Sequence, residues 1–232
     1  MSIGYDQLSK NAFQLLGSPF FEATGDVAVQ DIAKPHHVVT QSNSPTWTQL
    51  ASGIWVLDFN AAIPEYLQIS AAASADLNFI AQSFSIVWWM NADSIANSPV
   101  LFCKGAGSIA GYYVQVLSTG EFIIVTNQGA AFQSTSSAAG AVTISTWNCW
   151  GISRSGTSIR LFKNGIDVSS VIGSHINPVT SAAYIFYILI FNGGAVNSLD
   201  GKLWNPRVWS GVALSEYEHR FIFERERIWF GV

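Results

Sequence analysis

The sequence predicts an all-β protein, an antiparallel two-sheet sandwich with one short helix near the C-terminus. Between Phe84 and Asp167, short runs rich in Val, Ile, Phe, Tyr and Trp alternate with Gly, Asn, Asp or Ser, as antiparallel strands and their turns require. The 232 residues are 49% hydrophobic and only 11% charged, which is enough apolar material for one thick core. A convincing helical pattern is confined to the C-terminal region.

We expect a single domain over residues 15–232, because no linker interrupts the strand pattern. The segment from Gln133 to Ala141 is interpreted as a long loop between strands. Residues 1–14 are expected to form an N-terminal arm or a first strand. The runs SGIWVLDFN and EYLQIS predict two further strands, and Pro64 between them suits a turn.

Alternation in the run FSIVWWMNAD predicts one strand that is covered on both sides. One face carries Phe84, Ile86, Trp88 and Met90, and the other carries Ser85, Val87 and Trp89. Both faces are fairly apolar, which is typical of a strand buried between two layers.

The run GYYVQVL has a more polar second face. We expect its core face to hold Tyr112, Val114 and Val116, and its solvent-exposed, half-polar face to hold Tyr113, Gln115 and Leu117.

Two local motifs predict how the last third of the chain is built. Asn164-Gly165 predicts a two-residue hairpin between IRLFK and IDVSS, because a type I′ turn needs positive φ at both positions. Ser215 followed by Glu218 predicts a capping box at the start of a helix. We expect this helix to pack against the sandwich edge through Tyr217 and Phe221.

Composition argues against several classes of partner. The formal net charge of −4 and the scattered basic residues argue against nucleic acid. No apolar run reaches transmembrane length, so membrane insertion is not expected, and the N-terminus lacks the pattern of a signal peptide. Cys103 and Cys149 are interpreted as two buried thiols, with a disulfide as the alternative.

Taken in order, these segments resemble the laminin G-like, concanavalin A-like lectin/glucanase jelly roll, in the stand-alone form found in phage and bacterial surface proteins. The resemblance rests on FSIVWWMNAD, LFCKG before GYYVQVLSTGEF, TWNCWGISRSG, IRLFKNGIDV, LDGKLWNPRVWSGVALSEYE and ERERIWFGV. It covers roughly residues 15–232 and implies a jelly-roll sandwich. Such sandwiches host lectins, glucanases and pure assembly modules, so the resemblance implies fold more strongly than function.

No catalytic residues are expected. A retaining glycosidase needs two carboxyl groups about 5 to 5.5 Å apart, but no strand carries alternating carboxylates of the form E-x-D-x-x-E. A nucleophile elbow G-x-S-x-G is absent, and none of the four histidines has a convincing catalytic setting. His36 and His37 are interpreted as a solvent-exposed loop pair rather than metal ligands.

We expect no cofactor and no metal site. Asp26, Asp31 and Asp200 are interpreted as turn-forming residues, and a structural calcium ion held by them is the alternative. Where the resembled family often has an acidic pair before its second strand, this chain has Pro64-Glu65, which weighs against a calcium site of the family type.

The candidate glycan-binding residues are Trp89, Tyr113, Gln115 and Arg160. Alternation places them on faces opposite the inferred core, and sugars often stack on aromatic rings beside amide or charged groups. The alternative is that Trp89, like the other tryptophans, fills the sandwich.

We therefore hypothesise a non-enzymatic bacteriophage protein, a decoration or tail-associated virion subunit that presents a recognition or stabilising surface. Its expected partners are other virion proteins, further copies of itself, or a cell-surface glycan. The alternative is a carbohydrate-binding module of a bacterial surface or secreted protein, located outside the cell or on its surface. Catalysis, with turnover of a β-glucan, is the third and least favoured hypothesis.

Overall fold

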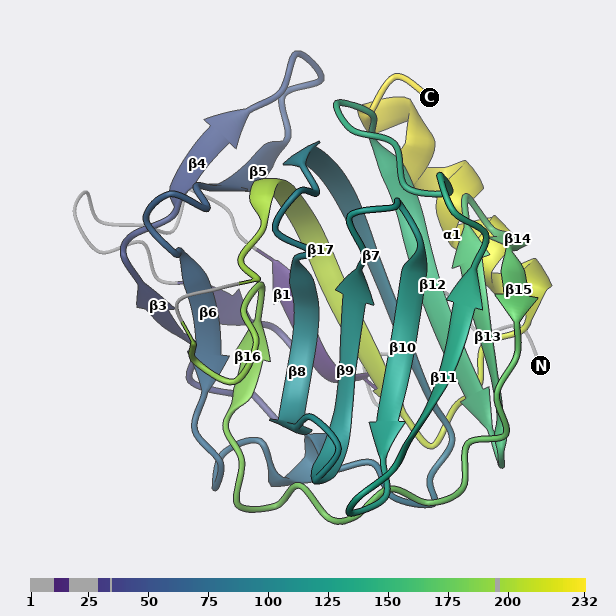
Figure 1. The fold of residues 1–232 in the computed structure, drawn as a ribbon. Coiled ribbons are helices and arrows are strands. Elements are labelled where there is room, and N and C mark those ends of the chain that lie inside the picture. Colours follow the sequence, from purple (N-terminus) through teal and green to yellow (C-terminus); the bar gives the residue numbers. More distant parts are fainter. Residues whose placement is uncertain (1–10, 17–28, 34, 195–196) are drawn as a thin grey trace.

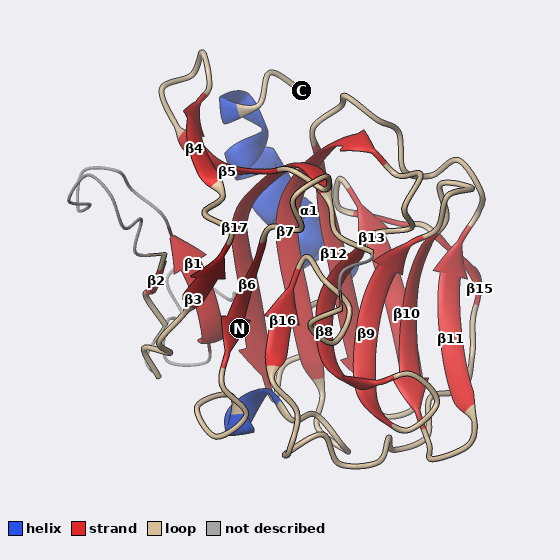
Figure 2. Cartoon of the chain, turned by 60° about the vertical axis from the view of Figure 1, so that its left-hand side comes forward, coloured by secondary structure: helices blue, strands red, loops and turns tan. Residues whose placement is uncertain are grey.

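The computed structural model describes residues 11–16, 29–33, 35–194 and 197–232, and shows two antiparallel sheets packed face to face (Figures 1 and 2). We name them the helix-side sheet and the opposite sheet. The helix-side sheet contains, in spatial order, β14 (Ile166–Asp167), β13 (Ser158–Lys163), β12 (Asn148–Ser155), β7 (Phe84–Ser94), β17 (Asp200–Ser210), β1 (Asn11–Leu16) and β2 (Gln30–Asp31). In addition, β5 (Trp55–Phe59) pairs with β17, and β4 (Thr46–Gln49) pairs with β5.

The opposite sheet forms the second layer. It contains, in spatial order, β15 (Ser169–Val171), β11 (Phe132–Ser137), β10 (Phe122–Asn127), β9 (Ala110–Val116), β8 (Val100–Ala106), β16 (Phe186–Ile188), β6 (Tyr66–Ile69) and β3 (Thr40–Ser42). A 3-10 turn, η3 (Ala75–Leu77), follows β6. Helix α1 (Glu216–Glu226) lies on the outer face of the helix-side sheet and continues into the 3-10 turn η4 (Arg227–Trp229) (Figure 1). The predicted all-β sandwich with a C-terminal helix is confirmed.

Strand β7 is buried on both faces, as its alternation predicted. Phe84, Ile86, Trp88 and Met90 belong to the core between the sheets. Val87 and Trp89 belong to a second apolar cluster between this sheet and the C-terminal helix. The helix-side sheet is therefore the middle layer of the molecule at this point.

Strand β9 follows its predicted alternation too. Tyr112, Val114 and Val116 are buried in the core, whereas Tyr113, Gln115 and Leu117 are half-buried on the other face.

The predicted hairpin is confirmed in its register and its backbone angles. Lys163 pairs with Ile166, and the two turn residues, Asn164 and Gly165, have φ of 53° and 78°. A Cβ on Gly165 would lie 2.3 Å from Cα of Arg220, so this position requires glycine for space as well as for φ.

The capping box of α1 is confirmed, but the predicted buried face of the helix is wrong. The Ser215 hydroxyl accepts from the backbone N–H of Glu218, and the Glu218 carboxylate accepts from the backbone N–H of Ser215. Tyr217 is 76% exposed and Phe221 is only half-buried. The residues of α1 that are buried against the sheet are His219, Ile222, Phe223 and Glu226.

His37 is buried, so the prediction of an exposed histidine pair holds only for His36, which is exposed. Nδ1 of His37 lies 2.5 Å from Oδ2 of Asp31, and Nε2 of His37 lies 2.9 Å from Oδ1 of Asp76. Burial by itself lowers the pKa of His37, but the hydrogen bonds and charges of the two aspartates outweigh burial and raise it to about 9. The ring is a cation that ties the segment after β2 to η3.

The cysteines are free thiols, so the alternative of a disulfide is excluded. Cys103 lies on β8 and Cys149 on β12, in different sheets, and both are buried. Residues 1–10, most of the predicted N-terminal arm, lie outside the described residues, while Asn11–Leu16 forms β1. The helices of the described ranges are too short or too polar to cross a bilayer.

Candidate functional site

The structure places the four predicted glycan-binding residues at three separate locations. Tyr113 and Gln115 lie on β9, on the outer face of the opposite sheet. Trp89 lies on β7 and Arg160 on β13, both in the helix-side sheet. The four side chains therefore do not form one site.

Trp89 is not available to a ligand, which corrects the prediction that it lines an open face. It is fully buried beneath the C-terminal helix, with its ring stacked on Phe230 at 4.0 Å between centroids. Its indole Nε1 donates to Oε2 of Glu226 at 2.7 Å. Arg207 reaches the same carboxylate with Nη1 at 2.8 Å and Nη2 at 2.9 Å. The Trp89 side chain thus packs and hydrogen-bonds at the interface between the C-terminal helix and the helix-side sheet.

Tyr113 and Gln115 are half-buried and engaged with their own chain. The Tyr113 ring meets Phe191 edge-on, at 5.3 Å between centroids and an interplanar angle of 79°. Burial raises the pKa of the Tyr113 hydroxyl. Gln115 donates from Nε2 to the carbonyl of Ser98 at 2.9 Å. Whether either residue contacts a glycan stays a prediction.

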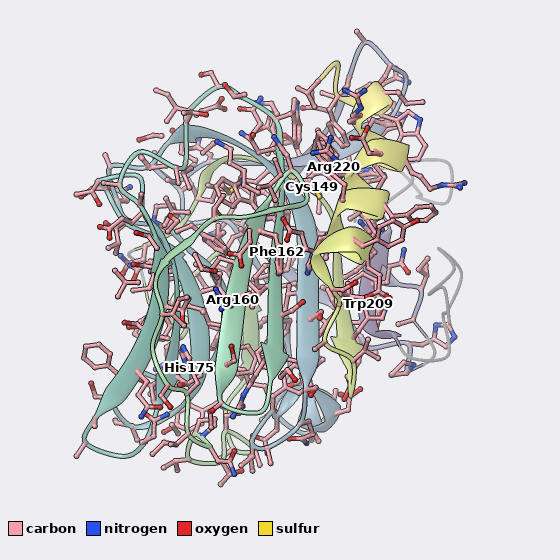
Figure 3. The ribbon with its side chains drawn as sticks, turned by 90° about the vertical axis from the view of Figure 1, so that its right-hand side faces the viewer. Cys149, Arg160, Phe162, His175, Trp209 and Arg220 are labelled. Carbon is pink, nitrogen blue, oxygen red and sulfur yellow. The ribbon has the colours of Figure 1, made fainter. Side chains whose placement is uncertain are left out.

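Arg160 lines an open groove of about 380 Å³ on the outer face of the helix-side sheet. Figure 3 shows Arg160 and Phe162 on the same strand, with the C-terminal helix beside them. The other lining residues come from β12, from β13 and β14, and from the segment that leads into α1. They are Ser153, Ser155, Ser158, Phe162, Asp167, Ala213, Leu214, Ser215 and Glu216.

A buried serine–histidine pair lies under the groove. Oγ of Ser153 is 2.8 Å from Nε2 of His219 and 2.9 Å from Oγ of Ser85. The His219 ring stacks on Phe162 at 4.0 Å, and a Cβ on Gly151 would meet its Nδ1 at 2.4 Å. The pair therefore fixes the start of the helix against β12 and β13.

This pair has the hydrogen bond of a nucleophile and its base, but its chemistry does not suit that role. Burial, reinforced by the charge of Arg207, lowers the pKa of His219 to about 3. An imidazole with so low a pKa is a weak base at neutral pH, because efficient general bases have a pKa near the working pH. His219 and Ser153 are 2% and 7% exposed, so the pair contributes mainly to packing.

The rim of the groove carries groups that can hydrogen-bond a polar ligand. Nη1 of Arg160 lies 3.5 Å from Oδ2 of Asp167, and both side chains are partly exposed, at 47% and 32%. Oε1 of Glu216 accepts from the backbone N–H of Asp167 at 3.2 Å. The exposed Ser155 and Ser158 add hydroxyl groups that can donate or accept. Together these side chains offer donors and acceptors to a hydroxylated molecule.

The sequence could have predicted that Asp167 lies in this groove beside Arg160. A two-residue turn at 164–165 pairs Phe162 with Asp167 and so puts Asp167 diagonally beside Arg160, on the same face. The position of Glu216 depends on the connection from β17 to α1 and has no local signal.

Within the described ranges, His, Cys, Asp and Glu side chains form no group of three that could hold a metal ion. Of the residues considered for calcium, Asp26 lies outside the described residues, and the carboxylate of Asp31 is hydrogen-bonded to His37. Asp200 begins β17, opposite Ser94. The expectation of no metal site, with a structural calcium ion as the alternative, stays a prediction.

Comparison with known proteins identifies relatives by family and by fold. The family model described as the concanavalin A-like lectin/glucanases superfamily matches residues 65–218. The binding domain of Paraclostridial Mosquitocidal Protein 1 superposes with a TM-score of 0.72 at 13% identity. The binding domain of botulinum neurotoxin DC, in complex with rat synaptotagmin II, superposes with 0.70 at 11%, and a structure of botulinum neurotoxin type C with 0.67 at 10%.

Each of these matches covers 94% of this chain and 52% of the other, so the chain spans about half the length of those structures. At such identities the likeness shows the fold alone. No curated protein matches the chain.

Proposed function

Because the chain belongs to the concanavalin A-like lectin/glucanase superfamily, we propose that it is a non-catalytic binding domain that holds a glycan in the groove beside Arg160. The observation that carries the proposal is the groove itself. Its volume of about 380 Å³ falls in the range of small-molecule sites, and its rim combines hydroxyl, guanidinium and carboxylate groups.

Hydrogen bonding, rather than ring stacking, would hold the ligand. The aromatic side chain that lines the groove, Phe162, is only 5% exposed and is covered by His219 on one face. Neighbouring sugar hydroxyls can donate to the carboxylates of Asp167 and Glu216, while the guanidinium of Arg160 donates to a ring or hydroxyl oxygen.

The charge of the groove favours a neutral or amine-bearing glycan over an acidic one. Arg160 contributes one positive charge, and Asp167 and Glu216 contribute two negative charges. An acidic sugar would place a third carboxylate beside these two, and like charges at an interface disfavour binding.

The fold relatives support binding as the general activity. One is a neurotoxin binding domain in complex with synaptotagmin II, and another is from a neurotoxin whose cell entry depends on two ganglioside molecules. Catalysis is disfavoured because the strands lack alternating carboxylates and His219 is a poor base.

We further propose that the domain is carried on a bacteriophage virion as a decoration or tail-associated subunit, with other virion proteins as neighbours. The support is the resemblance of the whole strand order to stand-alone phage domains. The alternative is a module of a bacterial surface or secreted protein. Mass spectrometry of purified bacteriophage particles distinguishes the two locations. Absence of the chain from the particles would refute the virion location.

The groove proposal is tested by glycan-array binding of the unsubstituted protein and four variants. We expect Arg160→Ala and Asp167→Asn to weaken binding of a neutral glycan roughly 10- to 100-fold, because each removes a charged hydrogen-bonding partner. Arg225→Ala removes an equally charged side chain from α1, outside the groove, and should bind normally. Tyr113→Ala tests whether the glycan binds instead on the outer face of the opposite sheet.

Two results would overturn the proposal. The unsubstituted protein binding no glycan would refute the lectin function, and a loss confined to Tyr113→Ala would move the site to the opposite sheet. Stronger binding of sialylated than of neutral forms of one glycan would refute the charge argument alone.

A further inference from the structure

A second surface, at one end of the opposite sheet, exposes four large apolar side chains. They lie at the β8–β9 turn, at the start of β11 and on the segment between β15 and β16. Ile109, Phe132, Ile176 and Val179 are 57%, 58%, 52% and 42% exposed. We name these four residues the apolar rim. The turns and the segment that carry these residues lie at the lower end of β8, β9, β10 and β11 in Figure 1. The groove beside Arg160 is lined by the other sheet.

Backbone hydrogen bonds join these segments to one another. The N–H of Ala130 donates to the carbonyl of Ser108 at 2.8 Å, which ties the β10–β11 turn to the β8–β9 turn. Val179 donates to Asn127 at 2.9 Å, and its carbonyl accepts from Gly111 at 2.9 Å, so it sits between β9 and β10. The backbone segments that carry the four side chains are therefore tied to one end of the opposite sheet.

The buried side chain of His175 anchors the segment that leads to Val179. Its Nδ1 lies 2.8 Å from Oγ1 of Thr126 and its Nε2 lies 2.9 Å from Oγ1 of Thr135. Burial and the nearby Arg154 lower the pKa of His175 to about 4, so the ring is neutral. Ile176 is therefore exposed although the residue next to it is held in place by a buried side chain.

The segments that carry the rim contain no charged residue in the sequence. Residues 105–111, 127–136 and 169–183 lack Asp, Glu, Lys and Arg throughout. Each segment belongs to a longer uncharged stretch of the chain, residues 105–120, 122–153 and 168–199.

We propose that the apolar rim is a contact surface for a second copy of this chain. In a two-fold symmetric contact the same patch lies on both partners, so a charge near the two-fold axis would lie close to its own copy. An uncharged apolar patch avoids that repulsion, and its burial removes exposed hydrocarbon from water. An anionic membrane is the less suitable partner, because it attracts basic residues, which these segments lack.

The contact is expected to be weak. Stable dimers bury about 800 Å² on each partner, and four side chains form only the apolar centre of such an area. Self-association should therefore appear as the protein concentration rises.

Sedimentation velocity over a concentration series tests this surface with a matched pair of variants. Ile176→Asp places a carboxylate in the rim, and Ile144→Asp makes the same change at a residue of equal exposure, 52%, between β11 and β12. We expect Ile176→Asp to weaken dimerisation about 100-fold, tenfold for each of the two copies in the contact, and Ile144→Asp to leave it unchanged.

Three outcomes would overturn the proposal. They are a monomer at all concentrations, a dimer that is insensitive to Ile176→Asp, and a dimer that both variants weaken equally. A parallel flotation assay uses neutral phosphatidylcholine vesicles and vesicles that also contain phosphatidylserine. Vesicle binding by a monomer, lost in Ile176→Asp, would identify the rim as a lipid contact and refute the dimer.

Discussion

The buried cation at His37 predicts that one contribution to the stability of the fold is lost as the pH rises above neutral. The folded pKa of about 9 exceeds the ordinary value of 6.5, so the folded state binds the proton more tightly than the unfolded chain. This contribution is fully present below pH 6.5 and is lost as the pH rises through about 9.

The expected magnitude follows from the width of the pH window. Each pKa unit corresponds to about 1.4 kcal/mol, so raising the pH from 6.5 to 8 should lower the contribution of His37 to the free energy of unfolding by up to about 2 kcal/mol. Above pH 8 the buried Lys104 acts in the opposite direction, because burial lowers its pKa to about 8 and folding then disfavours its proton. His175 and His219, whose pKa values burial lowers to about 4 and 3, also act in the opposite direction from pH 6.5 upward, because the unfolded chain still binds part of their protons there. The contribution of His37 is therefore isolated by comparing the protein with a variant that lacks this histidine.

Urea unfolding at several pH values, followed by tryptophan fluorescence, measures this effect. His37→Gln keeps two polar groups near Asp31 and Asp76 but cannot carry the charge, so its stability should vary less with pH across this range. His36→Gln is the matched control, because His36 is exposed and its loss should leave the pH dependence unchanged. An equal pH dependence of the free energy of unfolding in His37→Gln and in the unsubstituted protein would refute the reasoning.

Two further predictions concern the packing of the C-terminal helix. Glu226→Gln should lower the free energy of unfolding by about 3 kcal/mol, because it weakens a buried carboxylate–guanidinium pair with Arg207, whereas Glu224→Gln, at an exposed pair, should cost under about 1 kcal/mol. Equal losses would contradict the assignment of the buried pair. Gly151→Ala should cost about 1–3 kcal/mol, because its Cβ would lie 2.4 Å from Nδ1 of His219. Unchanged urea midpoints would show that the histidine moves freely.

Local rules accounted for most of the strands, one hairpin and the start of the helix. The segment from Gln133 to Ala141, interpreted as a loop, instead contains most of strand β11 (Phe132–Ser137). The two faces of β7 followed from alternation, since successive side chains of a strand point to opposite sides. The turn at Asn164 and the capping box at Ser215 followed from short-range backbone and side-chain geometry. Each of these features depends on residues close together in the chain.

The buried face of α1 could not be predicted in the same way. Its apolar pattern favoured Tyr217, yet the helix buries the charged Glu226 because Trp89 and Arg207 on the sheet donate to that carboxylate. Burying a carboxylate is favourable only when such donors are present, and they come from strands far away in the sequence.

The candidate site shows the same division. Arg160 was predicted from alternation, and the hairpin register could have added Asp167. Trp89 was misplaced because the face opposite the core was assumed to be open, whereas the helix covers it. Glu216 joins the groove through the connection from β17 to α1.

The sequence by itself determined an all-β sandwich with a capped terminal helix, because periodicity, turn geometry and capping are local properties of the chain. Only the tertiary structure decided which polar residues are buried and which side chains remain open to a ligand. His37, Glu226 and Arg160 are all charged, yet the first two lie inside and the third lines a groove. The difference comes from the partners that distant segments bring to them, since desolvating a charge is costly unless it is paired.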